Sequence, residues 1–180
     1  MNGCRALTTG FLFITMELTQ AQRTIKTNDG VNLMKISTKG RYGIVAMLDL
    51  ALNGTEETHV PLNHIAERQQ ISLSYLEQMF SRLRKAGYVK STKGPQGGYR
   101  LSDKPSHITA GDILRTLEGN VEVVEKSRQG IQNPYETCLY EHVWQPINRS
   151  INNTMDSITL EDLMEAFQRQ EKGEVLMFYI

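Results

Sequence analysis

Cysteines, long apolar runs and targeting signals are scarce in this chain. Only two of its 180 residues, Cys4 and Cys138, are cysteines, so no disulfide framework can form. No apolar run approaches the length that spans a membrane, and residues 11–14 are too few for the core of a signal peptide. These absences exclude a disulfide-rich secreted scaffold and predict a protein of the reducing cytoplasm.

Catalytic motifs are missing as well. The four histidines, at positions 59, 64, 107 and 142, show neither the HExxH spacing nor any other spacing of metal ligands. The sequence also has no GxGxxG segment, no P-loop and no nucleophile elbow. We therefore predict that the chain is not an enzyme.

A balanced total charge hides an uneven distribution. The chain has 20 Lys and Arg residues and 20 Asp and Glu residues. Residues 35–104 contain 11 basic and 6 acidic side chains, whereas residues 105–180 contain 6 basic and 12 acidic ones. Because Lys and Arg contacts to phosphates supply sequence-independent affinity for nucleic acid, the first segment suits a polyanion and the second does not.

Residues 62–101 show the parts of a winged helix in order: two short helices, a tight turn and a glycine-rich hairpin. Residues 69–71 form a turn short enough to set the two helices at an angle that suits the major groove. Ser72 is the predicted N-cap of the second helix, which ends at Gly87. Helical spacing assigns Leu73, Leu76, Phe80, Leu83 and Val89 to the core, and Ser74, Tyr75, Glu77, Gln78, Ser81 and Arg82 largely to the opposite face.

A hairpin follows the second helix, with a strand from Tyr88, a turn over residues 94–98 and a returning strand from Tyr99. Glycine adopts positive φ without steric cost, so the chain can reverse at this turn. Lys93 and Arg100 flank the tip, where both can reach a phosphate backbone. The joint pattern predicts DNA binding. Two alternatives stay open: a helix-turn-helix that is only a packing unit, and a winged helix that binds another protein.

A further helix is predicted ahead of the winged helix. It begins at Thr38, its predicted N-cap. Its N-terminal backbone N–H groups favour anions, so Thr38, Lys39 and Tyr42 are candidate contacts to a DNA phosphate; a solvated basic helix start is the alternative. The residues that follow at helical spacing are Tyr42, Val45, Ala46, Leu48, Asp49, Leu50 and Leu52.

The acidic second half contains two short helical patterns with a long apolar stripe between them. The first pattern covers Ala110–Glu118, between an N-cap at Thr109 and Gly119, and the second starts at Thr159. Because one helix cannot bury the stripe in so small a domain, we expect a two-fold partner to cover Val143, Ile147, Ile151 and Met155. Pro146 is expected to kink or restart this helix. The whole stripe is Leu139, Val143, Ile147, Ile151, Met155 and Ile158.

The predicted fold class is mainly α with a small β-wing: a winged helix-turn-helix domain plus a long dimerisation helix. Residues 1–33 are interpreted as an extension that is either a weakly structured arm or absent from the native protein, which would then start at Met34. The remaining divisions are a DNA-binding domain over residues 34–119, a loop of sensor type over 120–138, the dimerisation and final helices over 139–168 and a tail over 169–180.

Five motifs resemble the Rrf2 family of bacterial winged-helix transcription regulators. They are STKGRYG from Ser37, SLSYLEQMFSRLRKAG from Ser72, KGPQGGY from Lys93, ITAGDILRTLEG from Ile108 and ITLEDL from Ile158. The resemblance implies a homodimer that binds double-stranded operator DNA. The implied DNA contacts are Ser72, Ser74, Tyr75, Glu77, Gln78 and Arg82 on the recognition helix and Lys93, Gly94, Pro95, Gly97, Gly98 and Tyr99 in the wing. Glu77 can accept from a cytosine amino group and Gln78 can pair with adenine.

Iron–sulfur regulators of this family carry three cysteines and a nearby histidine in the loop before the long helix. Here only Cys138 stands at such a position; Glu141 takes the place of the histidine, and His142 lies one residue away. A [2Fe–2S] cluster needs four ligands, most of them thiolates, so we expect no cofactor. The alternatives for Cys138 are a partial metal site with His142 across a dimer, a redox-reactive thiol, and a buried cysteine that packs as a small apolar residue.

A cluster-free branch of the family, which represses genes of cysteine metabolism, offers a nearer resemblance. It is carried by MKISTKGRYG from Met34, ITAGDILRTLEG from Ile108 and the terminal MFYI from Met177. The branch senses sulfur supply by associating with cysteine synthase. A C-terminal isoleucine is also the feature by which serine acetyltransferase enters that enzyme's active site, so we hypothesise that Ile180 docks there with Tyr179 at its mouth; a tail packed on its own domain is the alternative.

Overall fold

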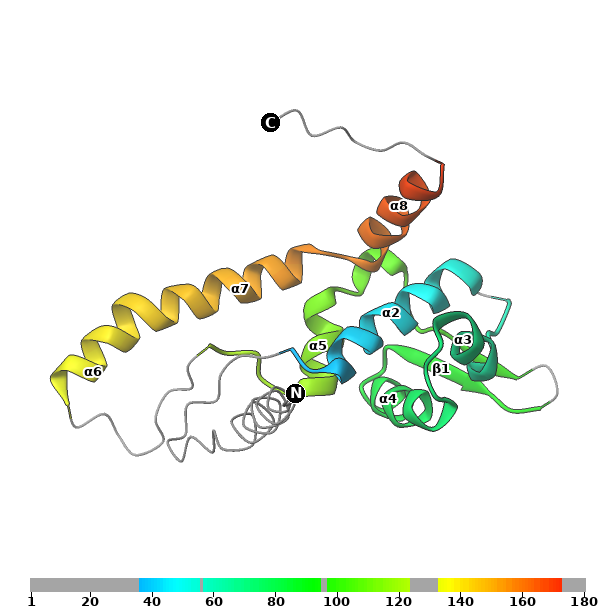
Figure 1. Ribbon diagram of the computed structural model, residues 1–180, viewed down its shortest axis with the longest axis horizontal. Coiled ribbons are helices and arrows are strands. Elements are labelled where there is room, and N and C mark those ends of the chain that lie inside the picture. The colour runs from blue at the N-terminus through cyan, green and yellow to red at the C-terminus, as the bar shows by residue number, and fades with distance from the viewer. Residues whose placement is uncertain (1–35, 56, 95–96, 124–132, 173–180) are drawn as a thin grey trace, which may run out of the picture. The chain divides into compact units, whose positions relative to one another are not determined.

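The computed structural model describes residues 36–55, 57–94, 97–123 and 133–172 (Figure 1). The predicted N-terminal extension and the terminal Tyr179 and Ile180 lie outside these residues. The described elements are α2 (Thr38–Asn53), α3 (Leu62–Gln69), α4 (Leu73–Lys85), β1 (Val89–Thr92), β2 (Gly98–Leu101), η1 (Pro105–His107), α5 (Ala110–Glu118), α6 (Pro134–Leu139), the π-helical turn η2 (Tyr140–Trp144), α7 (Gln145–Ser157) and α8 (Leu160–Glu171).

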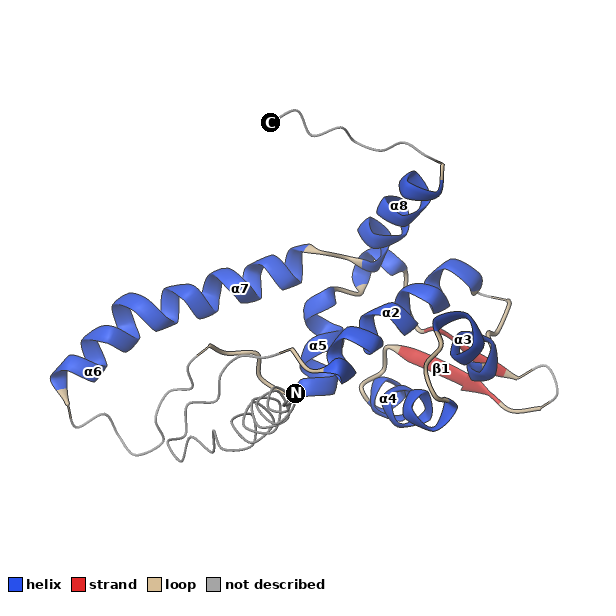
Figure 2. Ribbon diagram, in the orientation of Figure 1, coloured by secondary structure: helices blue, strands red, loops and turns tan. Residues whose placement is uncertain are grey.

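Helices dominate, and β1 and β2 form one antiparallel pair, which confirms the predicted fold class (Figure 2). The register pairs Val89 with Leu101 and Thr92 with Gly98. Val60 adds a short bridge on the far side of β2, with both backbone N···O distances to Tyr99 at 2.8 Å. The wing is therefore tied to the segment that leads into α3 as well as to α4.

The main core lies among α2, α3, α4, α5, the base of the wing and the start of α8. Phe80, Met47, Leu50, Ile65 and Leu76 are all fully buried there. Each such side chain contributes about 1.5–3 kcal/mol relative to its exposed state. The Phe80 ring also meets the Tyr99 ring edge to face, with 5.0 Å between the centroids, and so fixes β2 against α4.

Asp49 is a charged side chain inside this core, where it joins α2 to α3. Its carboxylate, whose side chain is only 2% exposed, accepts from Arg68 Nε at 3.0 Å and Nη2 at 2.5 Å and from Gln69 Nε2 at 2.7 Å. The hydrogen bond to Asp49 raises the pKa of Arg68. The bidentate pair holds α3, the first helix of the helix-turn-helix, at a fixed place on α2.

The start of α2 and the face that it buries differ from the sequence prediction. Ser37, not Thr38, is the N-cap: its Oγ accepts from the Lys39 backbone N–H at 3.0 Å. Tyr42 and Val45 are each 39% exposed although both were assigned to the packed pattern. Gly43 lies on the buried face instead. It packs so closely on Leu117 of α5 that a side chain at position 43 would overlap Leu117. Because glycine has no side chain, a buried helix face that contains glycine does not produce an apolar pattern in the sequence.

The start of α4 also departs from the prediction. Ser72 is the N-cap residue, but its side chain makes no capping hydrogen bond. Leu73, predicted in the core, is 43% exposed. The preceding turn explains the difference: Gln70 has φ of 52°, and the reversal puts Ile71, only 5% exposed, into the core position that Leu73 would have filled.

The capping predictions for α5 and α8 are confirmed. Thr109 and Asp112 form a reciprocal capping box at the start of α5, and Thr159 with Asp162 forms another at the start of α8. Gly119, with φ of 93°, ends α5. Burial opposes ionisation of Asp112, but hydrogen bonds from Thr109 and Tyr88 outweigh it and lower the pKa of this carboxyl below its usual 3.8.

The long helix runs from α6 through η2 into α7 without a break (Figure 1). Tyr140, Trp144 and Gln145 all have helical backbone angles. Pro146 therefore does not interrupt the helix. The π-helical turn just before it changes the hydrogen-bonding pattern where proline has no N–H to donate, and the α-helical pattern begins again in α7. No helix among the described residues is both long and apolar enough to cross a membrane.

Candidate DNA-binding surface

The outer face of α4 presents a row of polar side chains. Ser74, Glu77 and Gln78 are all exposed. Neither Glu77 nor Gln78 forms a side-chain hydrogen bond with another residue that the structure describes, so both are available to base edges. These residues are backed by the buried Met79 and Phe80, which fix the helix on its core.

Two other predicted contacts of α4 are engaged within the chain. Tyr75 is half-buried and meets Tyr42 of α2 edge to face, with 6.2 Å between ring centroids. Arg82 donates from Nη1 to the Leu117 carbonyl of α5 at 3.3 Å. The structure thus gives Tyr75 and Arg82 roles in joining α4 to its neighbours, and Tyr42, which contacts Tyr75, is 39% exposed.

The N-terminus of α2, predicted as a phosphate site, already holds an anion of the chain itself. The Glu118 carboxylate accepts from the Gly40 backbone N–H at 2.7 Å and from the Ser37 hydroxyl. It therefore occupies the position that a helix end offers to a phosphate. Thr38 is exposed and Lys39 half-buried beside it. The sequence does not indicate this role of Glu118, because Glu118 and Gly40 lie 78 residues apart and neither local pattern depends on the other.

The wing turn uses its glycines in two different ways. Gly94 has φ of 118°, as expected of a turn glycine. Gly98 instead has ordinary φ and is needed because a Cβ there would lie 2.6 Å from the Val60 carbonyl carbon, and Gly97 meets the backbone of Thr92 in a similar way. The chain reverses over this segment as predicted, and positive φ accounts for Gly94, whereas close backbone contacts account for Gly97 and Gly98. Lys93 is exposed beside the tip, and Pro95 lies outside the described residues.

A set of polar side chains holds the start of the loop after α5 onto α7. Asn148 Oδ1 accepts from the Val123 backbone N–H at 2.7 Å, and Asn152 Nδ2 donates to the Val121 carbonyl at 3.3 Å. Arg115 of α5 joins the same set through Asn152 at 3.3 Å and through Asp156, whose hydrogen bond raises the pKa of Arg115. The predicted sensor loop is thus anchored through residue 123, a feature that the sequence did not indicate.

The apolar stripe has an exposed first part and a buried part at Met155, beyond which Ile158 is again 36% exposed. Leu139, Val143 and Ile147 are 50%, 37% and 38% exposed. Met155, named with them as a dimer contact, is only 8% exposed because it packs on Leu114 and Val121 of the same chain. Ile151 lies between the two parts: it packs partly on that cluster and also lines a shallow hollow of about 270 Å³.

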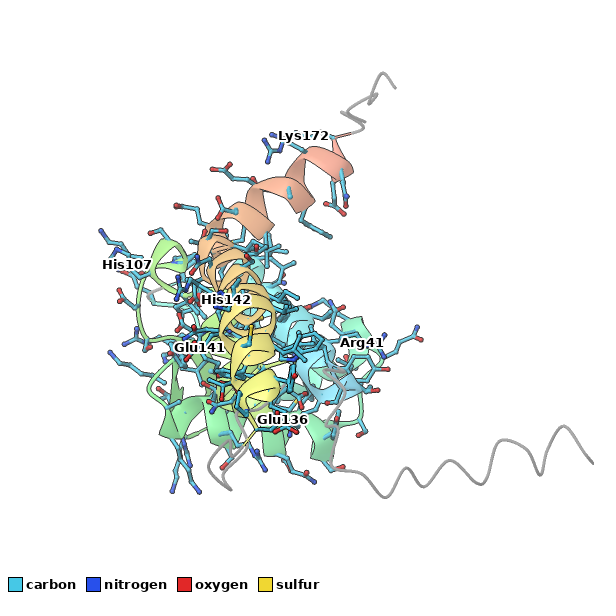
Figure 3. The ribbon with its side chains drawn as sticks, turned by 90° about the vertical axis from the view of Figure 1, so that its left-hand side faces the viewer. Arg41, His107, Glu136, Glu141, His142 and Lys172 are labelled. Carbon is cyan, nitrogen blue, oxygen red and sulfur yellow. The ribbon has the colours of Figure 1, made fainter. Side chains whose placement is uncertain are left out.

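Cys138 lies on α6 and is exposed, so the interpretation as a buried cysteine is wrong. Figure 3 looks from the end of the long helix and places Glu136, Glu141 and His142 along it. Within the part of the chain that the structure describes, no three His, Cys, Asp or Glu side chains are close enough to hold a metal ion together. Cys138 lies on the part of the long helix that has no buried residue, because the first buried side chain along it is Asn148 of α7.

The arrangement defines a winged-helix DNA-binding protein: α3 and α4 make the helix-turn-helix, and β1 and β2 make the wing. A family model described as Rrf2, iron-dependent transcriptional regulator, matches residues 36–166. The chain is 46% identical over 132 residues to the HTH-type transcriptional regulator IscR of Aliivibrio salmonicida, over 73% of this chain and 77% of that protein. It belongs to the Rrf2 family of transcriptional regulators, a family of DNA-binding proteins and not of enzymes.

Two solved structures share this fold at substantial identity. CymR (YrzC), the global cysteine regulator of B. subtilis, is 42% identical with a TM-score of 0.63, over 74% of this chain and 98% of that one. T. potens IscR is also 42% identical, with a TM-score of 0.58, over 81% of this chain and 93% of that one. The likeness therefore includes both types of regulator to which the motifs point.

The donor set of this chain does not fit the iron centre that the family description suggests. The segment between α5 and α7 contains one thiol, Cys138, and the second cysteine of the sequence is Cys4. An iron–sulfur cluster takes four ligands, with thiolates predominating. A cluster held by one thiolate per subunit would lack the ligands that stabilise it, so we assign the chain no iron chemistry.

Proposed function

We propose that this chain is a homodimeric repressor that reads its operator through Glu77 and Gln78. The observation that carries the proposal is the pair of unengaged, exposed side chains on α4 beside the basic wing. Ser72, Ser74 and the wing residue Lys93 supply phosphate contacts that set the register on the duplex. The protein thus combines base readout from α4 with backbone positioning by the wing.

Titration of operator and unrelated duplexes at several salt concentrations tests this proposal. Gln78→Ala is expected to weaken operator binding by about 1–3 kcal/mol and to relax preference at one base pair. Lys93→Ala is expected to weaken all duplexes alike and to reduce the salt slope by about one unit. Unchanged specificity in Gln78→Ala would refute the reading face. A wild-type protein with neither specificity nor salt dependence would instead favour a protein-binding module.

We further propose that the regulated genes serve cysteine and sulfur metabolism and that the regulator works in the cytoplasm without an iron–sulfur cluster. The likeness to CymR, named as a global cysteine regulator, and the single thiol in the segment before α7 support this proposal. Anaerobic purification followed by a visible absorption spectrum tests it. A colourless protein that still binds operator is expected, whereas a brown protein would refute it.

The exposed thiol of Cys138 favours a second candidate, a redox sensor without metal. An exposed cysteine can be oxidised reversibly, unlike one packed in a core. Operator binding would then change on mild peroxide treatment and recover with dithiothreitol. Cys138→Ser should abolish that response, and a response that persists in the variant would exclude Cys138 as the sensor.

The proposed signal for sulfur supply is a complex with cysteine synthase, formed through the tail that ends at Tyr179 and Ile180. These two residues lie outside the described part of the chain, so the proposal rests on the sequence of the tail. Deleting both residues should abolish binding to cysteine synthase in calorimetry and leave operator affinity unchanged. Equal affinity of the intact and shortened chains would refute the docking.

A further inference from the structure

A hollow of about 410 Å³ lies where the C-terminal half of α2, the end of β2 with the turn after it, and α8 meet. Among the residues that the structure describes, none from α4 lines this hollow, so it is separate from the reading face. Its volume falls in the range of about 300–1000 Å³ that small-molecule sites occupy. The hollow has an apolar floor and a charged rim.

The floor of the hollow is held in place by the main core. Leu50 is fully buried and Ala51 is 6% exposed. Leu101 of β2 and Met164 of α8 pack against the same core and complete the floor. A methionine side chain is unbranched and adapts its shape to the group that it contacts. The floor therefore suits a short aliphatic or thioether chain.

The rim carries charges of both signs. Arg100 and Lys104 are cationic, and Asp103 is the acidic residue among the described residues that line the hollow. The Lys104 backbone N–H donates to Asp103 Oδ1 at 2.7 Å, and His107 Nδ1 lies 3.2 Å from the same oxygen. These contacts, with that of the Lys104 N–H the larger, lower the pKa of Asp103, so its carboxylate is ionised at neutral pH.

Several polar groups of the rim are available to a ligand. Neither Asp103 Oδ2 nor Lys104 Nζ has a hydrogen-bond partner in the part of the chain that the structure describes. Arg100 Nη1 lies 3.5 Å from the Leu101 carbonyl oxygen, at the limit of a hydrogen bond. The other N–H groups of this guanidinium can hold a carboxylate through two parallel hydrogen bonds. The rim thus offers one place for an anionic group and another for a cationic group.

We propose that this hollow binds a free α-amino acid with an apolar side chain of about the size of leucine or methionine. The ligand's carboxylate pairs with Arg100, and its ammonium group pairs with Asp103. Its side chain rests on Leu101 and Met164. A simple carboxylate would be repelled by Asp103 and a simple amine by the two cations, so a molecule with both charges fits the rim better than either. The inference goes beyond the proposed function, because it concerns a second ligand at a second site.

Methyl NMR of the full chain with labelled methionine observes the site directly, because Met164 lines the hollow. The Met164 signal is identified by its absence from the spectrum of Met164→Leu. L-Leucine is titrated up to about 10 mM beside two analogues that each lack one charge. Isocaproate lacks the ammonium group, and isoamylamine lacks the carboxylate. L-Leucine should shift the Met164 signal and should bind at least about tenfold more tightly than either analogue.

Asp103→Asn and Arg100→Gln test the two ends of the ligand separately. Asparagine keeps an oxygen that accepts from the Lys104 N–H, so the turn is retained. Each variant should weaken L-leucine binding by about tenfold, whereas Asp103→Asn should not weaken isocaproate and Arg100→Gln should not weaken isoamylamine. The matched controls are Glu67→Gln and Lys90→Gln, at exposed residues that do not line the hollow, and both should bind L-leucine as the wild type does.

A Met164 signal that stays in place throughout the L-leucine titration would overturn the inference. Equal binding of L-leucine and isocaproate would also overturn it, because the acidic residue of the rim would then have no role. If the control variants lose as much affinity as Asp103→Asn and Arg100→Gln, the general charge of the head and not this hollow holds the ligand. If operator DNA moves the Met164 signal and L-leucine does not, the hollow is a DNA contact. Each of these failures leaves operator reading by α4 untouched, so it is distinguishable from failure of the proposed function.

Discussion

The winged-helix head and the long helix satisfy their apolar residues differently. In the head, Met47, Phe80 and their neighbours are fully buried within one chain. In the long helix, Leu139, Val143 and Ile147 are at least 37% exposed, although they follow one another at helical spacing. The head therefore buries its apolar residues within one chain, whereas the first half of the long helix has an apolar face that no other residue described by the structure covers, as in a subunit of a larger assembly.

The net charge also differs between the segment of the head and the segment of the long helix. The segment that contains the head and wing carries five more basic than acidic residues, and the segment that contains the long helix carries six more acidic than basic ones. Phosphates are attracted to the first and repelled from the second. The charge distribution thus favours contacts to DNA by the first segment and not by the second.

The largest effect is expected from a charge placed in the exposed stripe. If the dimer buries Ile147, each of its two copies contributes about 1.5–3 kcal/mol. Ile147→Asp should raise the dimer dissociation constant about 1000-fold or more in sedimentation equilibrium. Gln145→Asp, on an exposed position of the same helix away from the stripe, should leave the dimer intact. A dimer that survives Ile147→Asp would place the interface elsewhere.

A smaller effect, confined to the head, is expected from loss of the buried carboxylate. Asp49→Ala removes the acceptor of Arg68 and Gln69 and should lower the free energy of unfolding by about 2–3 kcal/mol. Denaturant unfolding of the two proteins measures the difference. Glu67→Ala, at an exposed position on α3, should change stability by less than about 0.5 kcal/mol. Equal stability of Asp49→Ala and the wild type would show that solvation of the two partners compensates for their pairing.

The smallest effect on stability is expected from loss of the Asp112 carboxylate, and it depends on pH. The folded-state pKa of Asp112 is lowered, so its ionised form stabilises the protein above the unfolded pKa of 3.8, and this contribution disappears as the pH falls through the lower folded pKa. Asp112→Asn should therefore cost about 1 kcal/mol at neutral pH and show a shallower loss of stability below about pH 4. Parallel acid limbs in the two proteins would contradict the assignment.

The sequence predicted the elements that depend on neighbouring residues. The bounds of α5 followed from Thr109 and Gly119, which act through backbone groups a few residues away. The predicted turn over residues 69–71 and both wing strands are present for the same reason. Capping and turn geometry depend on adjacent residues, so a single sequence is enough to locate the caps and turns.

The features that escaped prediction depend on partners far along the chain. Glu118 fills the α2 N-terminus from 78 residues away, and Gly43 is buried only because Leu117 lies against it. The anchoring of the loop by Asn148 is of the same kind, with its partner 25 residues away. Such contacts are set by the packing of whole helices, which periodicity within one helix does not specify.

The π-helical turn has a consequence for the geometry of the apolar stripe. Residues four apart advance by about 400° in an α-helix, so a repeat of four drifts sideways by about 40° at each step. A turn of about 4.4 residues rotates less per residue and removes roughly 90° over five residues. The two steps from Leu139 to Ile147 span this turn and would otherwise drift by about 80°. The π-helical turn therefore cancels most of this sideways drift, so that the exposed side chains of the stripe follow one line along the helix.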